Sequence, residues 1–593
     1  MTLVDIVLAI VKIVIMVGFF VNMAAVGIWA DRRQSAMVQD RVGPNRAVIA
    51  LPSSVVRLIV LLPPSLLGAL ALAPVIPGLS AYAGLRPIAA EVLNLSTQLA
   101  VLVCWFSLVV LTATVRRTGA INRFEAMFEG MDPRGFFYAG VAAHAVGFAA
   151  TSLVPAESVL TAARVMSGAL GAVFFLAGLY AASRVPEGPI EIRAAGLLHS
   201  LADAAKLILK EDFVPKNADR LLHAIAPMIA LFPALVTMAV IPFGQTLCLQ
   251  GNAGKPLAWS DLGHVAPTMG RDLVCRGHAV SLQVADLNVG ILYIFALAST
   301  GVIGAAIAGW ASDNKYSLLG GLRAASQMVS YEVAMGLSLV GLFMIYGSVR
   351  LGQMVEWQGE NAWGIFVQPV AFFLFLAALA AETKRVPFDQ PEGESEIVAG
   401  YSLEYSGMKF GMFYMGEYID LFVSSAILVT LFFGGYALPF LHADGITVAF
   451  GELKLFEYRM THLSVVVLSA LAFFGKTMLM SWVQIFFRWT LPRFRYDQVM
   501  KLGWTKLLPA ALANLMITGI ALLAIQGAGP GVQSVVKVIL DVTQAIVAVG
   551  ALAAVIALVV GLLEPVERKK FLQSSAARFA AAAGGTKAEP QQA

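Results

Sequence analysis

The chain has 593 residues, of which 59% are hydrophobic and 13% are charged. Ordinary soluble domains carry about twice that share of charged residues, so the composition excludes a soluble fold. The formal net charge of +4 is spread over many short segments, and no continuous basic patch indicates a nucleic acid as a partner.

Apolar stretches long enough to cross about 30 Å of hydrocarbon recur along the whole chain. Because only helices of this kind satisfy their backbone groups in lipid, we predict an all-α polytopic membrane protein with about 13 transmembrane helices. The expected spans are 6–30, 54–82, 95–115, 135–155, 160–183, 221–243, 285–309, 329–348, 364–382, 412–438, 462–487, 506–526 and 533–563.

Every second expected loop is rich in Lys and Arg, which is typical of cytoplasmic loops. This alternation predicts a periplasmic N-terminus and a cytoplasmic C-terminus. The first apolar run is too long for the core of a signal peptide, so we expect it to remain as a helix.

After the first span, residues 31–46 read DRRQSAMVQDRVGPNR. Their arginines could pair with lipid phosphates or help to line a site for an amphipathic ligand, and composition alone does not choose. Further along, Asp203, Lys206 and Lys210 have the i, i+3 and i+7 spacing that places them on one face of a helix. We expect this helix to be amphipathic and cytoplasmic.

The cysteines give no sign of a metal site. Cys104 lies in an apolar span, whereas Cys248 and Cys275 share an expected periplasmic loop, where a disulfide and two separate thiols are equally open. No CxxC or Cys/His cluster suits a metal or an iron-sulfur centre. No Walker A or GxGxxG motif suits a nucleotide, so we do not expect this chain to bind NADH itself.

The segment that follows the ninth expected span is unlike any other part of the chain and is expected to be a long acidic cytoplasmic loop. Its carboxylates are Glu382, Asp389, Glu392, Glu394, Glu396 and Glu404, with Lys384 and Arg385 as internal counter-charges. Crowded carboxylates raise one another's pKa and can pass protons near neutral pH. A merely solvated loop is the alternative, but the aromatic residues and helix breakers among the acids favour a proton site.

Two further carboxylates, Glu332 and Glu417, lie deep in apolar sequence. Ionisable residues are costly in lipid and usually line a polar route through a membrane protein. We therefore predict a function for both.

Several segments together resemble the motifs of one family, the H subunit of bacterial NADH-quinone oxidoreductase (complex I), which is the counterpart of mitochondrial subunit 1. The resemblance covers about residues 6–46 and 195–526. It is carried by QDRVGPNR, LADAAKLILKED, DLNVGILYIFALAS, GWASDNKYSLLGGLRAASQMVSYEVAMGLSLV, AAETKRVPFDQPEGESEIVAGYSLEYSGMKFGMFYMGEY and FFRWTLPRFRYDQVMKLGWTKLLP.

The resemblance implies a subunit that is not catalytic alone but lines a quinone chamber and begins a proton relay. Quinone would be the substrate, and FMN and iron-sulfur clusters would belong to partner subunits. The implied chamber residues are Arg41, Arg46, Asp203, Asp389, Glu392 and Glu394. The implied relay residues are Glu332, Glu382, Glu396, Glu404 and Glu417.

The same resemblance implies a location in the bacterial inner (plasma) membrane. The expected partners are the hydrophilic quinone-reducing subunits, the antiporter-like membrane subunits and membrane lipid. The chain departs from the family at Lys384, Val386 and Gln390, where Asn, a small residue and Leu are common. The carboxylates of the motif remain, so we expect the activity to be retained.

The chain also carries a large insertion. We expect a first transmembrane helix and cytoplasmic loop at 1–46, an inserted four-helix membrane segment at 47–193 and a membrane core of the family's type at 194–526. A final transmembrane helix at 527–563 and a disordered cytoplasmic tail at 564–593 complete the expected organisation. We expect the insertion to be a lateral scaffold, and the alternative is that it alters quinone entry.

Two other functions compete with this interpretation. The homologous membrane subunit of an ion-pumping hydrogenase-type complex would bind no quinone, but the full PFD, EGESE and EYSGMKF run favours the quinone enzyme. A stand-alone secondary transporter would show internal repeats, and we find none in the sequence.

Overall fold

The computed structural model describes residues 3–39, 41, 43–44, 47, 49–55, 58, 190–192, 196–249, 275, 278–442, 445–450, 453–459, 462–528 and 530–563. The expected spans 54–82, 95–115, 135–155 and 160–183 lie outside these residues apart from the first few positions of 54–82, as do Arg46 and the tail 564–593.

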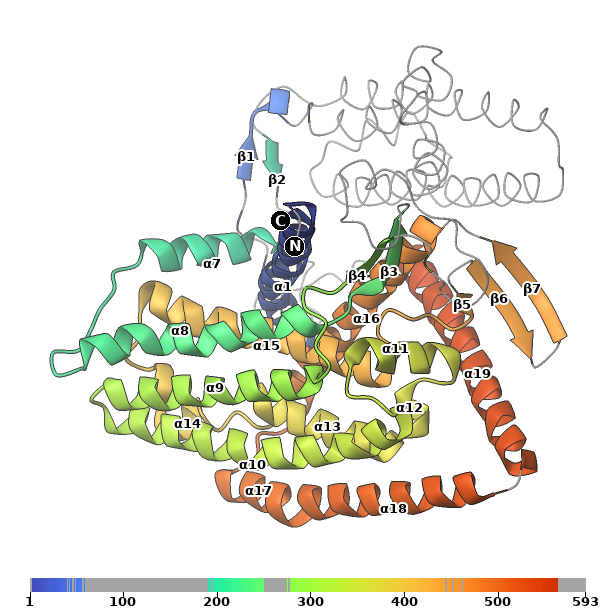
Figure 1. Ribbon diagram of the computed structural model, residues 1–593. Coiled ribbons are helices and arrows are strands. Elements are labelled where there is room, and N and C mark those ends of the chain that lie inside the picture. Colours follow the sequence, from blue (N-terminus) through green and yellow to red (C-terminus); the bar gives the residue numbers. More distant parts are fainter. Residues whose placement is uncertain are drawn as a thin grey trace, which may run out of the picture.

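The described residues contain seven helices that are long and apolar enough to cross a membrane. They are α1 Leu3–Val38, α8 Arg220–Thr237 with the 3₁₀ turn Met238–Val240, α9 Gly290–Ala311, α10 Lys315–Tyr346, α15 Gly407–Phe432, α16 His462–Thr490, and the run of α17 Tyr496–Leu502, a π turn Gly503–Leu507 and α18 Leu508–Gly527. This confirms an all-α polytopic membrane fold, and the long helices pack side by side (Figure 1).

Two further expected spans form helices that are not among these seven. The span at 364–382 forms a shorter apolar helix, α13 Pro369–Glu382, preceded by the single turn α12 Gly364–Val367. At the C-terminal end, α19 Pro530–Leu563 has 34 residues.

The remaining helices are short. The amphipathic helix expected near Asp203 is α7 Leu198–Leu209, whose Ser200 is buried while Leu201 and Leu209 are exposed. The others are α11 Leu351–Glu360, the single turn α14 Glu394–Ile397 and the 3₁₀ turn η5 Gly400–Ser402 in the acidic loop.

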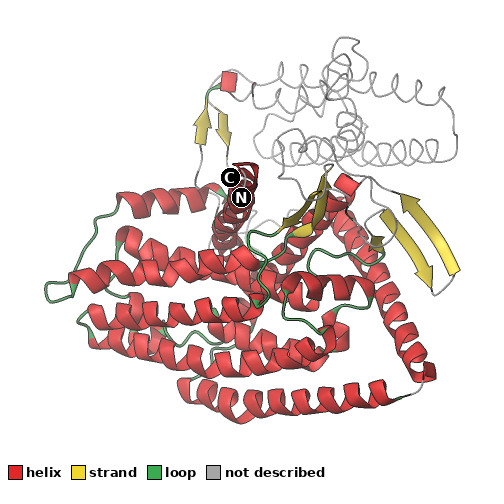
Figure 2. Ribbon diagram, in the orientation of Figure 1, coloured by secondary structure: helices red, strands yellow, loops and turns green. Residues whose placement is uncertain are grey.

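Three small antiparallel sheets accompany the helices in the described part of the chain, and the sequence did not predict them (Figure 2). They consist of β1 Ile49–Leu51 with β2 Ile190–Ile192, β3 Gly244–Leu249 with β4 His278–Leu282, and β5 Leu441–His442, β6 Gly445–Phe450 and β7 Leu453–Arg459 in that order. A disulfide joins Cys248 of β3 to Cys275, just before β4.

Small residues allow the helices to approach closely, as is common where lipid removes the hydrophobic drive between helices. A side chain at Gly309 of α9 would meet the Ser317 carbonyl oxygen of α10 at 2.6 Å, and one at Gly304 would meet the backbone nitrogen of Ala230 in α8 at 2.7 Å. These contacts bring α8, α9 and α10 together. Behind them, α15 lies in the core, where Tyr418 and Phe432 are fully buried.

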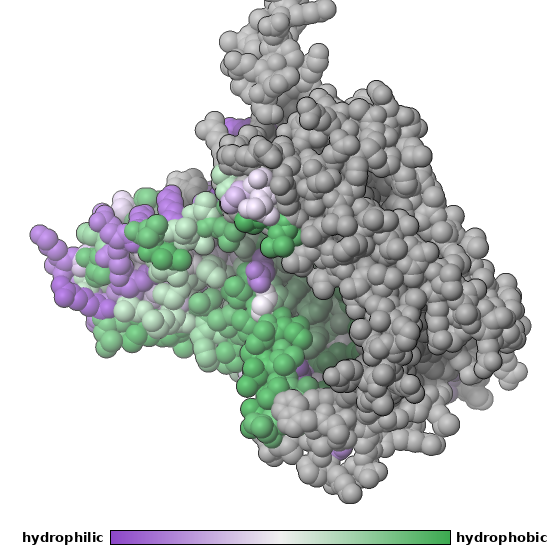
Figure 3. Space-filling view, turned by 90° about the horizontal axis from the view of Figure 1, so that it is seen from above, coloured by the Kyte–Doolittle hydropathy of each residue, from purple (hydrophilic) through white to green (hydrophobic). Residues whose placement is uncertain are grey.

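On the face seen in Figure 3, the described residues form a polar end and an apolar flank. Hydrophilic residues gather where α7 is connected to α8, and exposed Glu211, Asp212 and Lys216 belong to this connection. Apolar residues cover the adjoining helices. This distribution suits a bundle whose long axis crosses a membrane.

Candidate functional site

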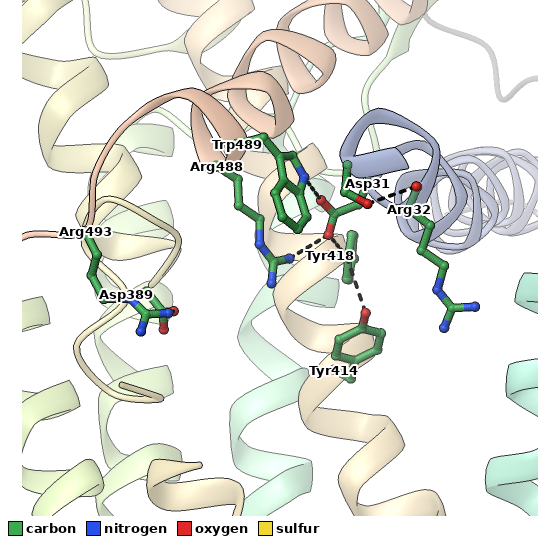
Figure 4. Close-up of polar contacts among 9 residues, drawn as sticks. Asp31, Arg32, Asp389, Tyr414, Tyr418, Arg488, Trp489 and Arg493 are labelled. Atoms are coloured by element: carbon green, nitrogen blue, oxygen red, sulfur yellow. Dashed lines mark hydrogen bonds and ion pairs between the residues drawn. The ribbon is translucent and has the colours of Figure 1, made fainter. Parts of the chain in front are cut away.

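The centre of the polar interior is Asp31, near the end of α1. Its side chain is buried, and its Oδ2 accepts hydrogen bonds from the Tyr418 hydroxyl at 2.7 Å and from the Arg488 guanidinium at 2.6 Å (Figure 4). Its Oδ1 accepts from Nε1 of Trp489 at 2.6 Å. Asp31 therefore ties α1 to α15 and α16, and these donors offset the cost of burying its charge.

Arg385 lies next to this centre, in the loop that follows α13. Its guanidinium carbon is 4.0 Å from the centroid of the Tyr418 ring, the geometry of a cation–π contact. The side chain is buried, yet none of its three guanidinium nitrogens has a hydrogen-bond partner among the described residues. A buried cation without a hydrogen-bond partner is costly. The charge of Arg385 therefore depends for stabilisation on the Tyr418 ring and on nearby anionic groups.

Hydrogen bonds from neighbouring elements hold the first part of the acidic loop in place. Gln327 of α10 is fully buried and donates to the carbonyl oxygens of Ala381 at 2.7 Å and Phe388 at 2.8 Å. The backbone nitrogen of Phe494, just after α16, donates to the Pro387 carbonyl at 3.1 Å. The loop is therefore attached to the bundle on two sides.

Asp389 of this loop forms an ion pair with Arg493 at 2.6 Å (Figure 4). Burial raises the pKa of the Asp389 carboxyl to about 6, although the Arg493 charge acts in the opposite direction. The group can therefore change its charge close to neutral pH.

Glu392 shares a hydrogen bond with Glu417 of α15. The negative charge of Glu417 and then burial raise the pKa of Glu392 well above its usual value. Two carboxyl groups this close disfavour each other's ionised form, which explains the direction of this shift at Glu392. The Tyr401 hydroxyl adds a bond to Glu417 at 3.3 Å.

From this pair, carboxylates continue through the bundle. Asp420 lies three residues after Glu417 on α15, and i, i+3 residues are neighbours on a helix surface. Glu382, buried at the end of α13, is within electrostatic range of both Asp420 and Glu332. Glu332 of α10 in turn accepts a hydrogen bond from the Ser299 hydroxyl of α9.

We call this set the carboxylate row. It consists of Asp389, Glu392, Glu417, Asp420, Glu382 and Glu332, in the order of their electrostatic interactions. The order follows the charge interactions of Asp389 and Glu392 with Glu417, and of Glu382 with Asp420 and Glu332. The row contains five of the residues predicted for the chamber and the relay.

The other predicted relay residues have separate partners. Glu396 forms an ion pair with Arg323 at 2.6 Å, and Glu404 accepts from the Asn314 side chain at 2.6 Å. Neither contact joins them directly to the carboxylate row. Glu394 begins α14, and its side chain is outside the described atoms.

The predicted chamber residues near the first helix are placed as follows. Asp203 of α7 forms an ion pair with Arg32 at 2.6 Å, which attaches the amphipathic helix to the end of α1. Arg41 is exposed just beyond α1. The predictions for both residues remain untested by these contacts.

Sequence reasoning missed the central Asp31 and also Asp420. The signal for Asp420 was present, because it follows Glu417 by one turn in the apolar segment MGEYID. Asp31 was missed because it belongs to the DRR run, and such a run at the end of a span has the composition of an anchor at the membrane surface. Its role depends on Arg488 and Tyr418, which sequence spacing does not bring near it.

The part of the chain that the structure describes contains no group of three or more His, Cys, Asp or Glu side chains that could hold a metal ion. The fold and the site together define a class: a multi-pass membrane protein whose helix bundle contains a row of buried and half-buried carboxylates.

Comparison with known sequences identifies the family. The sequence profile of the NADH dehydrogenase family matches residues 165–519, which is more than half of the chain. The first H subunit of the NADH-quinone oxidoreductase of Cytophaga hutchinsonii is 41% identical over 336 residues, covering 57% of this chain and 86% of that relative. The first H subunit of the Geobacter metallireducens enzyme is 44% identical over 333 residues, covering 56% and 85% respectively.

A third relative, the H subunit of the Flavobacterium psychrophilum enzyme, is 44% identical over 336 residues, covering 57% of this chain and 87% of the relative. These matches extend over most of each relative. The chain therefore belongs to the NADH dehydrogenase family, among the H subunits of NADH-quinone oxidoreductases.

Proposed function

We propose that the chain is the membrane subunit of a proton-translocating NADH:quinone oxidoreductase that forms the floor of the quinone chamber and the first part of the proton path. The observation that carries this proposal is the carboxylate row, which begins in the acidic loop and continues through α15, α13 and α10. The names of relatives that are 41% to 44% identical support the same function.

The quinone chamber would lie where the acidic loop meets the ends of α1 and α16. Support comes from the polar groups that converge there, with Asp389 on Arg493, Asp31 on Arg488, and Arg385 without a hydrogen-bond partner among the described residues. Arg41, Arg46, Asp203, Glu392 and Glu394 complete the proposed lining.

Reduction of a quinone to a quinol consumes two electrons and two protons. Protons drawn from the region of Asp389 would leave new negative charge beside the Glu392–Glu417 pair, which shares a hydrogen bond. That charge would attract a proton from the Glu392–Glu417 pair, and the pair would be refilled along the row from the direction of Glu332 and Glu382. The protein groups thus accept, hold and release protons, while the electrons arrive from partner subunits.

In this proposal FMN and the iron-sulfur clusters belong to the hydrophilic partner subunits, and Glu332 leads toward the antiporter-like membrane subunits. Glu396 and Glu404, which were predicted as relay members, would act at the cytoplasmic surface through Arg323 and Asn314. The relay role of these two residues remains a proposal.

The orientation that we propose places α7 and the acidic loop on the cytoplasmic side of the bacterial inner membrane. The disulfide between Cys248 and Cys275 supports this, because disulfides persist on the oxidising, periplasmic side. The N-terminus would be periplasmic and the C-terminus cytoplasmic, in keeping with the distribution of Lys and Arg.

The insertion at 47–193 would be a lateral scaffold. Its two ends meet in the β1–β2 pair, where Ile49 lies opposite Ile192 and Leu51 opposite Ile190. An insertion whose ends are adjacent leaves the path of the core chain unchanged. The ion pair of Asp203 with Arg32, which joins elements on either side of the insertion, supports this interpretation.

The two alternatives have less support. A hydrogenase-type membrane subunit would share the carboxylates, but the three relatives described above carry the name of the quinone enzyme. A stand-alone transporter would not need the cytoplasmic acidic loop to be attached to α10 by Gln327.

The proposed function is tested in native membranes by NADH:quinone reductase activity with and without a quinone-site inhibitor. Membranes that carry the wild-type chain should show inhibitor-sensitive activity, and Glu392→Gln should lose most of it at matched assembly. Asp497→Asn is the control, because Asp497 is exposed and pairs only with the neighbouring Arg495 among the described residues. Full activity in Glu392→Gln would contradict the proposal.

A further inference from the structure

Lys384 is placed beside the carboxylate row by an unusual backbone conformation. It follows α13 by two residues and has a φ of +55°, in the left-handed region that residues other than Gly rarely adopt. Its backbone nitrogen bonds to the Ala381 carbonyl at 3.3 Å. The chain therefore turns sharply here instead of continuing α13, and the half-buried Lys384 is held at the end of that helix.

The ammonium group of Lys384 interacts with several members of the row. It is within electrostatic range of both Glu382 and Asp420. It also lies 5.4 Å from the centroid of the Tyr401 ring, whose hydroxyl donates to Glu417. Lys384 thus faces carboxylates contributed by α13 and α15.

Lys384 nevertheless forms no ion pair within 4.0 Å with any carboxylate that the structure describes. This distinguishes it from Arg488 and Arg493, which are each held by one aspartate at 2.6 Å. A flexible ammonium group between two carboxylates can approach whichever one is ionised.

The other charged groups around this position are few. Glu382 faces Glu332 of α10, and Asp420 faces Glu417 and Arg385. Arg385 stacks on Tyr418 and interacts electrostatically with Asp31 and Arg488. Lys384 is therefore the cation that acts on both Glu382 and Asp420, whereas Arg385 acts on Asp420 from the side of Asp31.

We propose that Lys384 is a positioning residue of the proton path, an internal counter-ion that pairs alternately with Glu382 and Asp420 and sets the pH range in which the carboxylate row passes protons. The inference rests on the proposed function. In each step an O–H bond of one carboxyl breaks and an O–H bond of the next forms. Lys384 keeps its three protons and moves its charge toward the carboxylate that has just become ionised.

The test is proton translocation per NADH oxidised, measured from pH 6 to pH 9 in membranes that contain the assembled complex. The measured quantity is the pH at which translocation falls to half on the alkaline side. Without the cation, the carboxylates hold their protons to higher pH, so Lys384→Met should raise this half-point by about one unit. Lys384→Arg, which keeps the charge, should leave it within a few tenths of a unit.

Lys384→Gln removes the same charge with a polar side chain, so the inference stays testable where Lys384→Met does not assemble. It should raise the half-point in the same direction and by a similar amount as Lys384→Met. Lys409→Met is the matched control, because Lys409 pairs with the exposed Asp212.

An unchanged half-point in assembled Lys384→Met or Lys384→Gln would overturn the inference. A merely structural role for Lys384 would lower translocation equally at every pH and leave the half-point in place. Failure of the proposed function would look different, since wild-type membranes would then show no inhibitor-sensitive NADH:quinone reductase activity at all.

Discussion

The Asp31 carboxylate on α1 accepts a 2.7 Å hydrogen bond from the Tyr418 hydroxyl on α15, 387 residues further along the chain. Tyr418 is also the ring on which Arg385 of the acidic loop stacks. One side chain of α15 thus connects the end of the first helix to the loop that opens the carboxylate row. A change of charge at Asp31 would therefore alter the electrostatic potential at Arg385, and a change at Arg385 would alter the potential at Asp31.

Replacing Asp31 by Asn should destabilise the subunit. It removes the negative partner of Arg488, whose ion pair with Asp31 is 2.6 Å long, and leaves that cation in a mostly buried site. Breaking such a pair costs on the order of 3 kcal/mol. Thermal unfolding of the purified complex in detergent measures the effect. Asp497→Asn, which breaks a fully exposed pair, should change stability far less; equal effects of the two variants would show that Asp31 has no special role.

Asp389 should give the stability of the fold a pH dependence between about pH 4 and pH 6. Its folded pKa is raised to about 6, so the folded state binds more protons than the unfolded state below that pH. The stabilisation by the protonated carboxyl is present at the acidic end and is lost as the pH rises to 6. Thermal midpoints at pH 5.0 and 7.0 should differ less in Asp389→Asn than in the wild type, and an identical difference would argue against the raised pKa.

Gly320 of α10 should be required for the position of the acidic loop. A methyl group there would meet the Cα of Gly400 and the backbone nitrogen of Tyr401, each at 2.6 Å. Gly320→Ala should push the loop away and lower reductase activity by tenfold or more, since displacements of about 1 Å can cost about that much. Gly336→Ala is the matched control on the same helix, because a methyl group there meets nothing within 4 Å. Equal activity in both variants would be inconsistent with this packing.

The disulfide between Cys248 and Cys275 should stabilise the β3–β4 hairpin. It closes a loop with a sequence separation of 27 residues, for which the chain-entropy relation gives about 3 to 4 kcal/mol. Cys275→Ser should therefore lower the thermal midpoint, and so should a reductant added to the wild type. A free thiol at both positions in protein purified without reductant would contradict the pairing.

The sequence predicted the helical class well, because hydropathy over long windows reports directly on transfer into lipid. Boundaries were less accurate. The expected span at 329–348 belongs to α10, which begins at Lys315, since Gly320 and Gly321 let that helix continue against η5 and α9 beyond the apolar window. The hairpins were missed because β3 and β7 are short and depend on pairing with segments that hydropathy does not identify.

The sequence predicted only part of the site, because hydropathy identifies isolated carboxylates but not their long-range partners. Glu332 and Glu417 stand out because a single carboxylate in apolar sequence is unusual. The contribution of Asp31 and the separate placement of Glu396 depend on long-range partners, Arg488 and Arg323, and no spacing rule brings those residues together.

The central claim is that the carboxylate row couples quinone reduction to proton translocation, and Glu417→Gln tests it most directly. Glu417 interacts with Glu392 and precedes Asp420 by one turn, so its neutral replacement interrupts the row in the middle. NADH oxidation and proton uptake are measured together in membranes with equal amounts of assembled complex. The account predicts that Glu417→Gln loses most proton translocation together with inhibitor-sensitive turnover, whereas wild-type rates of both in this variant would contradict it.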